Sequence, residues 1–312
     1  MNAGPRRKEE MKIEDALLFV RQAADVGINT ISLTGGEPFL CYENMLKICH
    51  CASKLGLEVN TLTNCSWATS ESTAVRKLGK LKQFGLGKIT INADEFHQEF
   101  VPLERVKLCF KASRKVGLGI ELRCIVAKNT KRMEYFAKKI GALGKEGVIM
   151  NEFPVIPAGR GAGLDRDILL YPPMTSPCPF VLRMMAVEPN GDLAACCGVG
   201  GFSPPLIVGN VKKYGLKKLV AIADQDPLYS CLAFYGPQTL LEIIKEKGYK
   251  LNVSGKHVDR CHVCFELLSN VRNQSVVREV LKLVEDELSL AKMLSGIIDE
   301  LPPLRLLKKG NR

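Results

Sequence analysis

The stretch INTISLTGGEPFL, residues 28–40, decides how this chain is organised. The apolar and β-branched run 30–33 predicts a short strand, and Thr34-Gly35-Gly36-Glu37-Pro38 follows it as a turn. Two glycines without Cβ atoms let the backbone approach a ligand, Glu37 adds an acceptor-only carboxylate for a cationic group, and Pro38 fixes the direction of the departing chain. The same residues are also typical of a strand-to-helix turn, in which the helix dipole favours the Glu.

Outward from this turn, strand-like and helix-like segments alternate. Strands are predicted at 30–33, 58–62, 88–91, 119–126 and 148–153, and helices at 13–24, 43–54, 70–84, 103–115 and 131–143. Alternation at about thirty-residue spacing indicates βα units on a parallel sheet. The sequence therefore predicts an α/β fold.

The loops after these strands hold the chemically informative residues. They comprise 35–38, 64–67, 92–97 and 154–160. Functional groups of parallel βα folds gather beyond the carboxyl ends of the strands, so we expect these loops to converge on one site.

The alternation of strand-like and helix-like segments ends after Gly163. Glu188-Pro189-Asn190-Gly191-Asp192 between apolar stretches predicts a hairpin, and residues 276–301 predict a helix followed by a basic tail. We place the domains at 1–165, 166–270 and 271–312.

Composition narrows the function classes. The net charge is +11, but the Lys and Arg residues are dispersed and not interleaved with aromatic residues, so nucleic-acid binding is disfavoured. No run of about 18 apolar residues and no leader-like segment is found, so we expect a cytoplasmic protein with no membrane partner. In a reducing cytosol, the twelve cysteines favour metal binding or core packing over disulfides.

Four cysteines form a candidate metal site: Cys178, Cys196, Cys261 and Cys264. Their thiolates could hold a [4Fe–4S] cluster or zinc, and spacing alone does not choose between these. Cys197 could replace Cys196. Three further cysteines are predicted to be small core residues: Cys109, Cys124 and Cys231.

The stretch 28–40, together with Thr63-Asn64, residues 92–100 and Pro157-Ala158-Gly159-Arg160, resembles the radical S-adenosylmethionine (radical SAM) superfamily. The resemblance implies a partial (β/α) TIM-like barrel that binds SAM at the strand ends. By this analogy the cofactor-binding residues are Gly35, Gly36, Glu37, Pro38, Asn64 and Asp94, the last two at the ribose. His97 is a weaker candidate for substrate contact.

The cysteine pattern similarly resembles the auxiliary-cluster domain of that superfamily, the twitch relative of the SPASM domain. SPASM proteins have further cysteines after the CxxC, and none follows Cys264 here, so we expect one auxiliary [4Fe–4S] cluster. The glycine-to-cysteine spacing of the family favours Cys196 over Cys197.

The superfamily also holds a catalytic [4Fe–4S] cluster on a CxxxCxxC loop before the glycine turn, and the 312 residues contain no such triplet. Either Met1 is an internal methionine, so that a longer form carries the loop and the first strand, or the chain is a remnant. We favour a longer form, because the strand ends and the auxiliary cysteines look intact. As printed, the chain is expected not to cleave SAM reductively.

The resemblance implies an enzyme that generates a 5′-deoxyadenosyl radical and abstracts hydrogen from a peptide or small-molecule substrate, with an external reductant such as flavodoxin or ferredoxin. The catalytic residues are not predicted. The alternative is a catalytically inactive relative that serves as an iron–sulfur or zinc scaffold or as an electron carrier.

Overall fold

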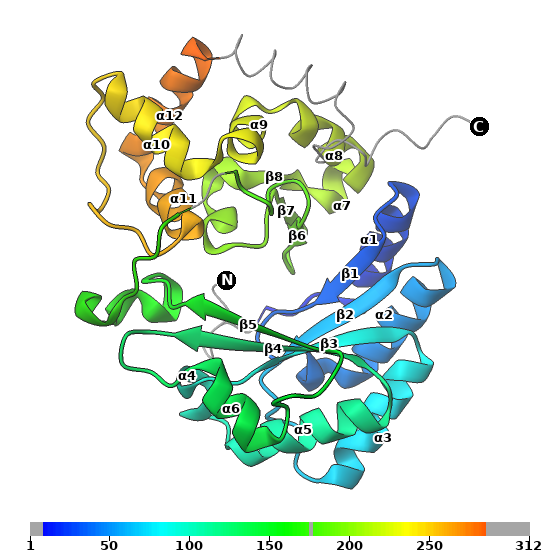
Figure 1. Ribbon diagram of the computed structural model, residues 1–312. Coiled ribbons are helices and arrows are strands. Elements are labelled where there is room, and N and C mark those ends of the chain that lie inside the picture. The colour runs from blue at the N-terminus through cyan, green and yellow to red at the C-terminus, as the bar shows by residue number, and fades with distance from the viewer. Residues whose placement is uncertain (1–8, 175–176, 285–312) are drawn as a thin grey trace.

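The computed structural model describes residues 9–174 and 177–284 (Figure 1). Within them, the first half of the chain forms a five-stranded parallel sheet with its strands in sequence order. The strands are β1 (Thr30–Leu33), β2 (Glu58–Thr63), β3 (Leu86–Asn92), β4 (Gly119–Val126) and β5 (Val148–Pro154). The predicted α/β class is therefore confirmed, and the sheet is consistent with a partial TIM-like barrel.

Helices alternate with these strands, as the βα rhythm predicts. They are α1 (Ile13–Asp25), α2 (Tyr42–Lys54), α3 (Glu71–Gln83), α4 (Glu95–Gln98), α5 (Leu103–Lys115) and α6 (Met133–Ile140), with the 3-10 helix η1 (Pro38–Cys41) after the glycine turn. The helix predicted at 131–143 is shorter than expected. It ends at Ile140 because Gly141 adopts φ +79°, a left-handed conformation that closes helices.

The helices α2, α3, α5 and α6 cover one face of the sheet (Figure 1). Val59, Ile89 and Leu122 point from the strands into this layer, where they pack fully buried with Leu78 of α3 and Phe110 of α5. Alternate strand residues point to the opposite face, which we call the open face. The open face carries polar side chains, so the sheet has one apolar and one functional side.

The second half of the chain builds a mainly helical unit on a small antiparallel sheet. In the described residues this sheet contains β6 (Ala186–Val187), β7 (Asp192–Ala194) and β8 (Ile207–Asn210). The α-helices are α7 (Val211–Tyr214), α8 (Leu216–Gln225), α9 (Pro227–Phe234), α10 (Gly236–Glu246), α11 (Arg260–Ser269) and α12 (Val271–Leu283). Short 3-10 helices are η2 (Gly159–Gly163), η3 (Arg166–Ile168), η4 (Val199–Phe202) and η5 (Pro204–Leu206).

The predicted hairpin is confirmed, because β6 and β7 pair antiparallel around residues 188–191. The helix predicted at 276–301 begins earlier, at Val271, and α12 ends at Leu283. Residues 285–312, including the rest of that prediction and the basic tail, lie outside the described residues.

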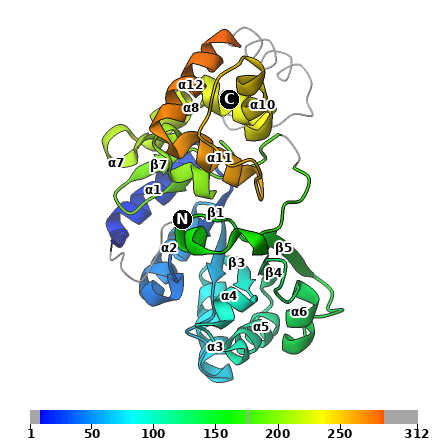
Figure 2. The same ribbon diagram turned by 90° about the vertical axis from the view of Figure 1, so that its left-hand side faces the viewer.

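The two units share an apolar core, although the domain boundary near residue 165 stays a prediction. Phe19 and Ala23 of α1 pack with Leu193, Leu216 and Leu219 of the second unit. Two polar contacts add to this interface: the Leu216 backbone N–H donates to Gln22 Oε1 at 2.7 Å, and Lys212 Nζ lies 3.2 Å from Asp15 Oδ2. Figure 2 shows the second unit stacked above the sheet.

In the described part of the chain, every helix is too short or too polar to span a membrane.

Candidate functional site

The turn after β1 leaves its glycine backbone open. Gly35 has φ +131°, which side chains rarely adopt, and a Cβ atom added at either Gly35 or Gly36 would meet no described atom within 4 Å. Pro38 then begins η1 and directs the chain away from the strand end. A ligand group can therefore approach the backbone of this turn closely.

Glu37 joins this turn to the end of β2. Its side chain is buried: Oε1 accepts from the Phe39 backbone N–H at 3.2 Å and from Thr63 Oγ1 at 2.9 Å, and Oε2 accepts from the Asn64 backbone N–H at 2.8 Å. Burial raises the pKa of Glu37, and these hydrogen bonds oppose the rise. Because both carboxylate oxygens bond to the protein, the turn offers its backbone to a ligand more readily than the Glu37 side chain.

An aromatic stack makes the two loops rigid. The rings of Phe39 and Trp67 are 3.8 Å apart and nearly parallel, and Trp67 Nε1 donates to Thr63 Oγ1 at 2.9 Å. Cys65, which lies between Thr63 and Trp67 in the sequence, is fully buried, and its backbone adopts a left-handed conformation with φ +66°. The ring stack and this hydrogen bond therefore join the loops after β1 and β2.

The two predicted ribose contacts, Asn64 and Asp94, both follow strand ends. Asn64 Oδ1 accepts from the Ser66 backbone N–H at 2.8 Å in a local turn. Asp94 is fully buried, and its carboxylate caps α4, contacts His97 Nδ1 at 2.8 Å and accepts from the Ile125 backbone N–H at 3.3 Å. The exposed group at this strand end is therefore the His97 ring, and ribose contact at Asp94 stays a prediction.

The four predicted cluster ligands come together around a cavity in the second unit. Cys178, Cys196, Cys261 and Cys264 all line it, whereas Cys197 is not among its lining residues. Cys261 and Cys264 lie on one turn of α11, Cys196 follows β7, and Cys178 is held by its backbone N–H, which donates to Leu232 O at 3.1 Å. Cys178 and Cys264 are 86 positions apart in the sequence, so the four cysteines meet only in the folded chain.

Electrostatics show the same proximity. Burial raises the pKa of Cys196 to about 12, and burial also raises the pKa values of Cys261 and Cys264. Beyond burial, the nearby Cys178 raises the pKa values of Cys196, Cys261 and Cys264, and Cys196 raises those of Cys261 and Cys264. Four thiolates this close repel one another, and a bound metal centre would relieve the repulsion.

Among the described residues, no group of three or more His, Cys, Asp or Glu side chains is placed so that it could hold a metal ion. A tetrahedral zinc site would require its sulfurs to lie within about 4.6 Å of one another, twice the zinc–sulfur bond length, whereas a [4Fe–4S] cluster binds one thiolate at each iron. A metal centre on the four thiols, and the choice between a cluster and zinc, therefore stay predictions.

Glycines of η4 make room beside the thiols. A Cβ atom on Gly198 would lie 3.0 Å from Cys261 Sγ and 3.8 Å from Cys196 Sγ, and one on Gly200 would lie 3.2 Å from Cys264 Sγ. The backbone of this loop therefore passes close to the thiols, and a side chain at Gly198 or Gly200 would press on them. The Gly-rich run after Cys197 was a signal for this site that sequence reasoning missed.

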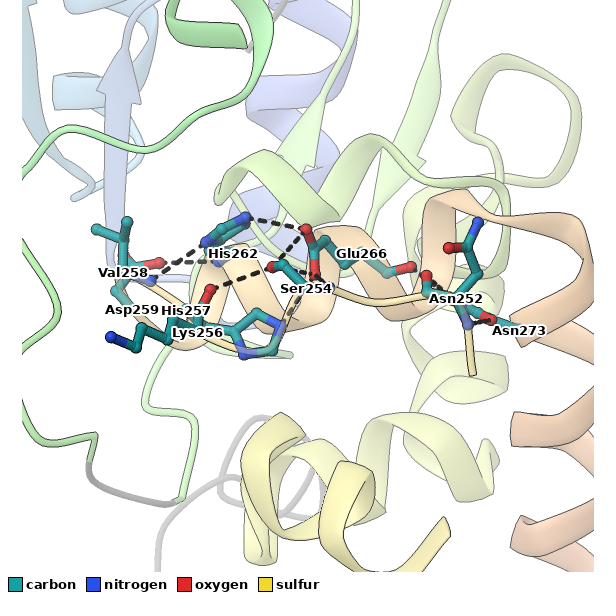
Figure 3. A network of polar contacts seen from close by, with 9 residues as sticks. All are labelled: Asn252, Ser254, Lys256, His257, Val258, Asp259, His262, Glu266 and Asn273. Carbon is teal, nitrogen blue, oxygen red and sulfur yellow. Dashed lines mark hydrogen bonds and ion pairs between the residues drawn. The ribbon is translucent and has the colours of Figure 1, made fainter. Parts of the chain in front are cut away.

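A buried polar network fixes the start of α11 (Figure 3). Glu266 accepts from the Ser254 backbone N–H at 2.7 Å and contacts the Nε2 atoms of His257 at 3.0 Å and His262 at 3.3 Å. His262 Nδ1 accepts from the Val258 backbone N–H at 3.2 Å, so its proton lies on Nε2, facing Glu266. The Asp259 carboxylate caps the helix through the His262 backbone N–H at 2.8 Å. The CxxC turn therefore sits on a rigid support.

Comparison with known proteins agrees with this geometry. The family model described as "Radical SAM superfamily" matches residues 2–124, which contain the glycine turn, Asn64 and Asp94. Over these residues the chain is similar to the radical SAM superfamily.

Three relatives resemble this chain over longer stretches. "Putative peptide biosynthesis protein YydG" of Bacillus subtilis (strain 168) is 22% identical over 262 residues, covering 81% of each chain. GTP 3',8-cyclase of Aliarcobacter butzleri (strain RM4018) is 24% identical over 171 residues, covering 51% of each chain. AdoMet-dependent heme synthase of Methanosarcina barkeri (strain Fusaro / DSM 804) is 27% identical over 165 residues, covering 49% of this chain and 44% of that protein.

The open face of the radical SAM sheet holds charged residues that sequence reasoning missed. Glu121 and Arg123 of β4 point there, and Arg123 Nε donates to Glu121 Oε1 at 2.7 Å. Arg123 also lowers the pKa of the Cys197 thiol in the second unit, which burial otherwise raises. The available signal was the alternation of these two charges with Ile120 and Leu122 in an apolar strand.

Proposed function

We propose that this radical SAM protein is an enzyme that binds SAM at the strand ends of its sheet and one auxiliary [4Fe–4S] cluster on Cys178, Cys196, Cys261 and Cys264. The observation that carries the proposal is the meeting of these four thiols around a cavity in a unit packed on a radical SAM sheet. In a longer form that carries the catalytic [4Fe–4S] cluster, bound SAM would supply a 5′-deoxyadenosyl radical that abstracts hydrogen from the substrate.

Different residues of the chain would bind different parts of SAM. The open backbone of Gly35 and Gly36 receives the methionyl amino group, while Glu37 and Pro38 keep the turn in place. Asn64 contributes its side-chain amide at the ribose. Asp94 acts there through His97, because its buried carboxylate orients the imidazole ring.

For the substrate we favour a peptide over a small molecule. The similarity to "Putative peptide biosynthesis protein YydG" covers 81% of this chain, which requires it to extend into both units. The similarities to the cyclase and the heme synthase cover about half of this chain. The auxiliary cluster would lie beyond the open face, where it can accept an electron from the substrate or ligate it.

Metal analysis after anaerobic reconstitution tests the cluster. We expect about four irons per chain and absorbance near roughly 400 nm, as a [4Fe–4S] cluster on four thiolates requires. Cys261→Ser should abolish this absorbance, whereas Cys197→Ser, which changes a neighbouring thiol outside the cavity lining, should retain it. One zinc and no iron would refute the cluster and favour the scaffold function.

A second measurement tests the SAM site. Gly36→Val should weaken SAM binding, measured by equilibrium dialysis, because its side chain enters the space before the turn. Gly255→Val is the matched control, since Gly255 also has free space around an added Cβ and lies outside the turn. Equal SAM binding by the two variants would remove the turn from the site.

A further inference from the structure

One charged side chain lines the cavity that the four cysteines share. Among the described residues of its lining, Arg260 alone carries a permanent charge. The rest of the wall is largely apolar and includes Phe180, Val181, Leu206, Leu232 and Pro237. Charges interact more strongly beside apolar walls than in open water, because fewer water molecules screen them. The electrostatics of this cavity therefore depend on Arg260 and on the cysteines themselves.

Arg260 connects two segments that carry cysteines of the site. It is the first residue of α11 and directly precedes Cys261. Its Nη1 donates to the Pro177 backbone oxygen at 2.7 Å, and Pro177 directly precedes Cys178. The two bonded residues are 83 positions apart in the sequence. A single side chain thus ties the segment of Cys178 to the CxxC turn.

The peptide group between Pro177 and Cys178 has both of its polar atoms bonded. Its C=O accepts from Arg260 of α11, and its N–H donates to Leu232 O of α9 at 3.1 Å. Since a peptide group is planar, two hydrogen bonds at its opposite ends fix the orientation of the whole plane. The Cα atom of Cys178 belongs to that plane, so these bonds also set the position from which its side chain starts.

Cys178 needs this support more than the other three cysteines do. Cys261 and Cys264 are held by helix α11 and Cys196 follows β7, whereas Cys178 lies outside the helices and strands. Cys178 is also half-buried, while Cys196 and Cys264 are buried. Without the hydrogen bond from Arg260, the peptide plane could turn about its one remaining bond, and the thiol would move more freely.

The charge of Arg260 acts on the same site. A guanidinium stays protonated at physiological pH, so Arg260 remains positive. The preceding Asp259 is negative, but its carboxylate caps α11 by accepting from the His262 backbone N–H at 2.8 Å, and the helix end compensates part of its charge. Four thiolates on a [4Fe–4S] cluster would carry net negative charge, which a nearby cation stabilises most after the cluster gains an electron. A cation at this place therefore favours the reduced form of such a cluster.

We propose that Arg260 is a positioning residue of the four-cysteine site. Its hydrogen bond to Pro177 O holds Cys178 in place, and its charge raises the reduction potential of the cluster. The second part rests on the proposed function, because it requires the cluster. The first part concerns the protein alone and can be tested without iron.

Alkylation of the iron-free full chain by iodoacetamide, followed for each cysteine by mass spectrometry, tests the hydrogen bond. In Arg260→Met we expect Cys178 to react about tenfold faster, the factor that corresponds to loss of a hydrogen bond from a charged donor. Cys231, a fully buried core thiol of the same unit, should stay unreactive and reports on unfolding. Arg272→Met is the matched control, since Arg272 is exposed on α12 and lies outside the cavity lining.

A second variant covers the case in which Arg260→Met unfolds the unit and exposes Cys231. Arg260→Gln keeps a polar side chain that is too short to reach Pro177, so it should also speed the reaction of Cys178. The positioning role is overturned if Cys178 reacts at the unaltered rate in whichever of these variants keeps Cys231 protected.

A redox titration monitored by electron paramagnetic resonance tests the charge in the reconstituted protein. The midpoint potential should fall in Arg260→Met, and it should stay close to that of the unaltered protein in Arg260→Lys, which keeps the charge, and in Arg272→Met. An unchanged potential in Arg260→Met overturns the electrostatic part. Absence of iron from the unaltered protein would instead contradict the proposed function, and the alkylation rates would still decide the positioning role.

Discussion

The sheet unit and the second unit build their sites in different ways. In the sheet unit, the loops after β1 and β2 are already fixed by protein contacts, since Glu37, Thr63 and Trp67 bond to one another. In the second unit, four cysteines line one cavity, and neighbouring thiols add to the burial that raises the pKa values of Cys261 and Cys264. The loops of the sheet unit are therefore preorganised by protein contacts, whereas the four-cysteine site of the second unit depends on what it binds.

Removal of the iron of the proposed cluster should change this difference between the two units the most. Loss of a structural metal centre removes binding energy of several kcal/mol from the folded state, so α9, α10 and α11 should lose protection against hydrogen exchange. The strands β2, β3 and β4 should keep their protection, because their core contains no metal ligand. Hydrogen exchange with mass spectrometry, before and after chelation, measures both. Equal loss of protection in the two units would contradict the comparison.

Glu37→Ala should have the next largest effect, this time on the sheet unit. The substitution leaves the N–H groups of Phe39 and Asn64 and the Thr63 hydroxyl without their acceptor, so we expect the free energy of unfolding to fall by about 2–4 kcal/mol. Urea unfolding measures this loss. Glu37→Gln keeps the shape and should lose less. Iron content should not change, and a loss of iron would show that the two sites are coupled.

Glu266→Gln should have the smallest effect and should appear in the second unit. An amide can still accept from Ser254, but it loses the charge that faces His257 and His262 (Figure 3). We expect a loss of about 1 kcal/mol in stability and faster loss of the absorbance during chelation. Glu242→Gln is the control, as Glu242 Oε1 accepts from Gln238 Nε2 at 2.8 Å on α10, away from the two histidines. Identical chelation rates for the two variants would exclude a supporting role for Glu266.

Much of the sheet unit could be predicted from local sequence. The strands β1 and β4 begin and end at the predicted residues, because apolar periodicity and bounding turns are local signals. The helix at 131–143 was predicted too long, since periodicity continues past the Gly141 cap. In the second unit the hairpin was predicted from its turn residues, but helices α8, α9 and α10 were not, although Asp226 and Pro227 at the start of α9 form a local cap signal.

The sequence by itself determined the parallel βα order, the glycine turn and the identity of four cysteines as a candidate metal site, because each depends on residue type and short spacing. Only the tertiary structure decided which partner each of these side chains contacts. Glu37 bonds to the end of β2, Asp94 is buried behind His97, and Arg123 donates to Glu121 on the open face. These outcomes depend on contacts between strands and between units, and burial there decides which polar atoms remain for a ligand.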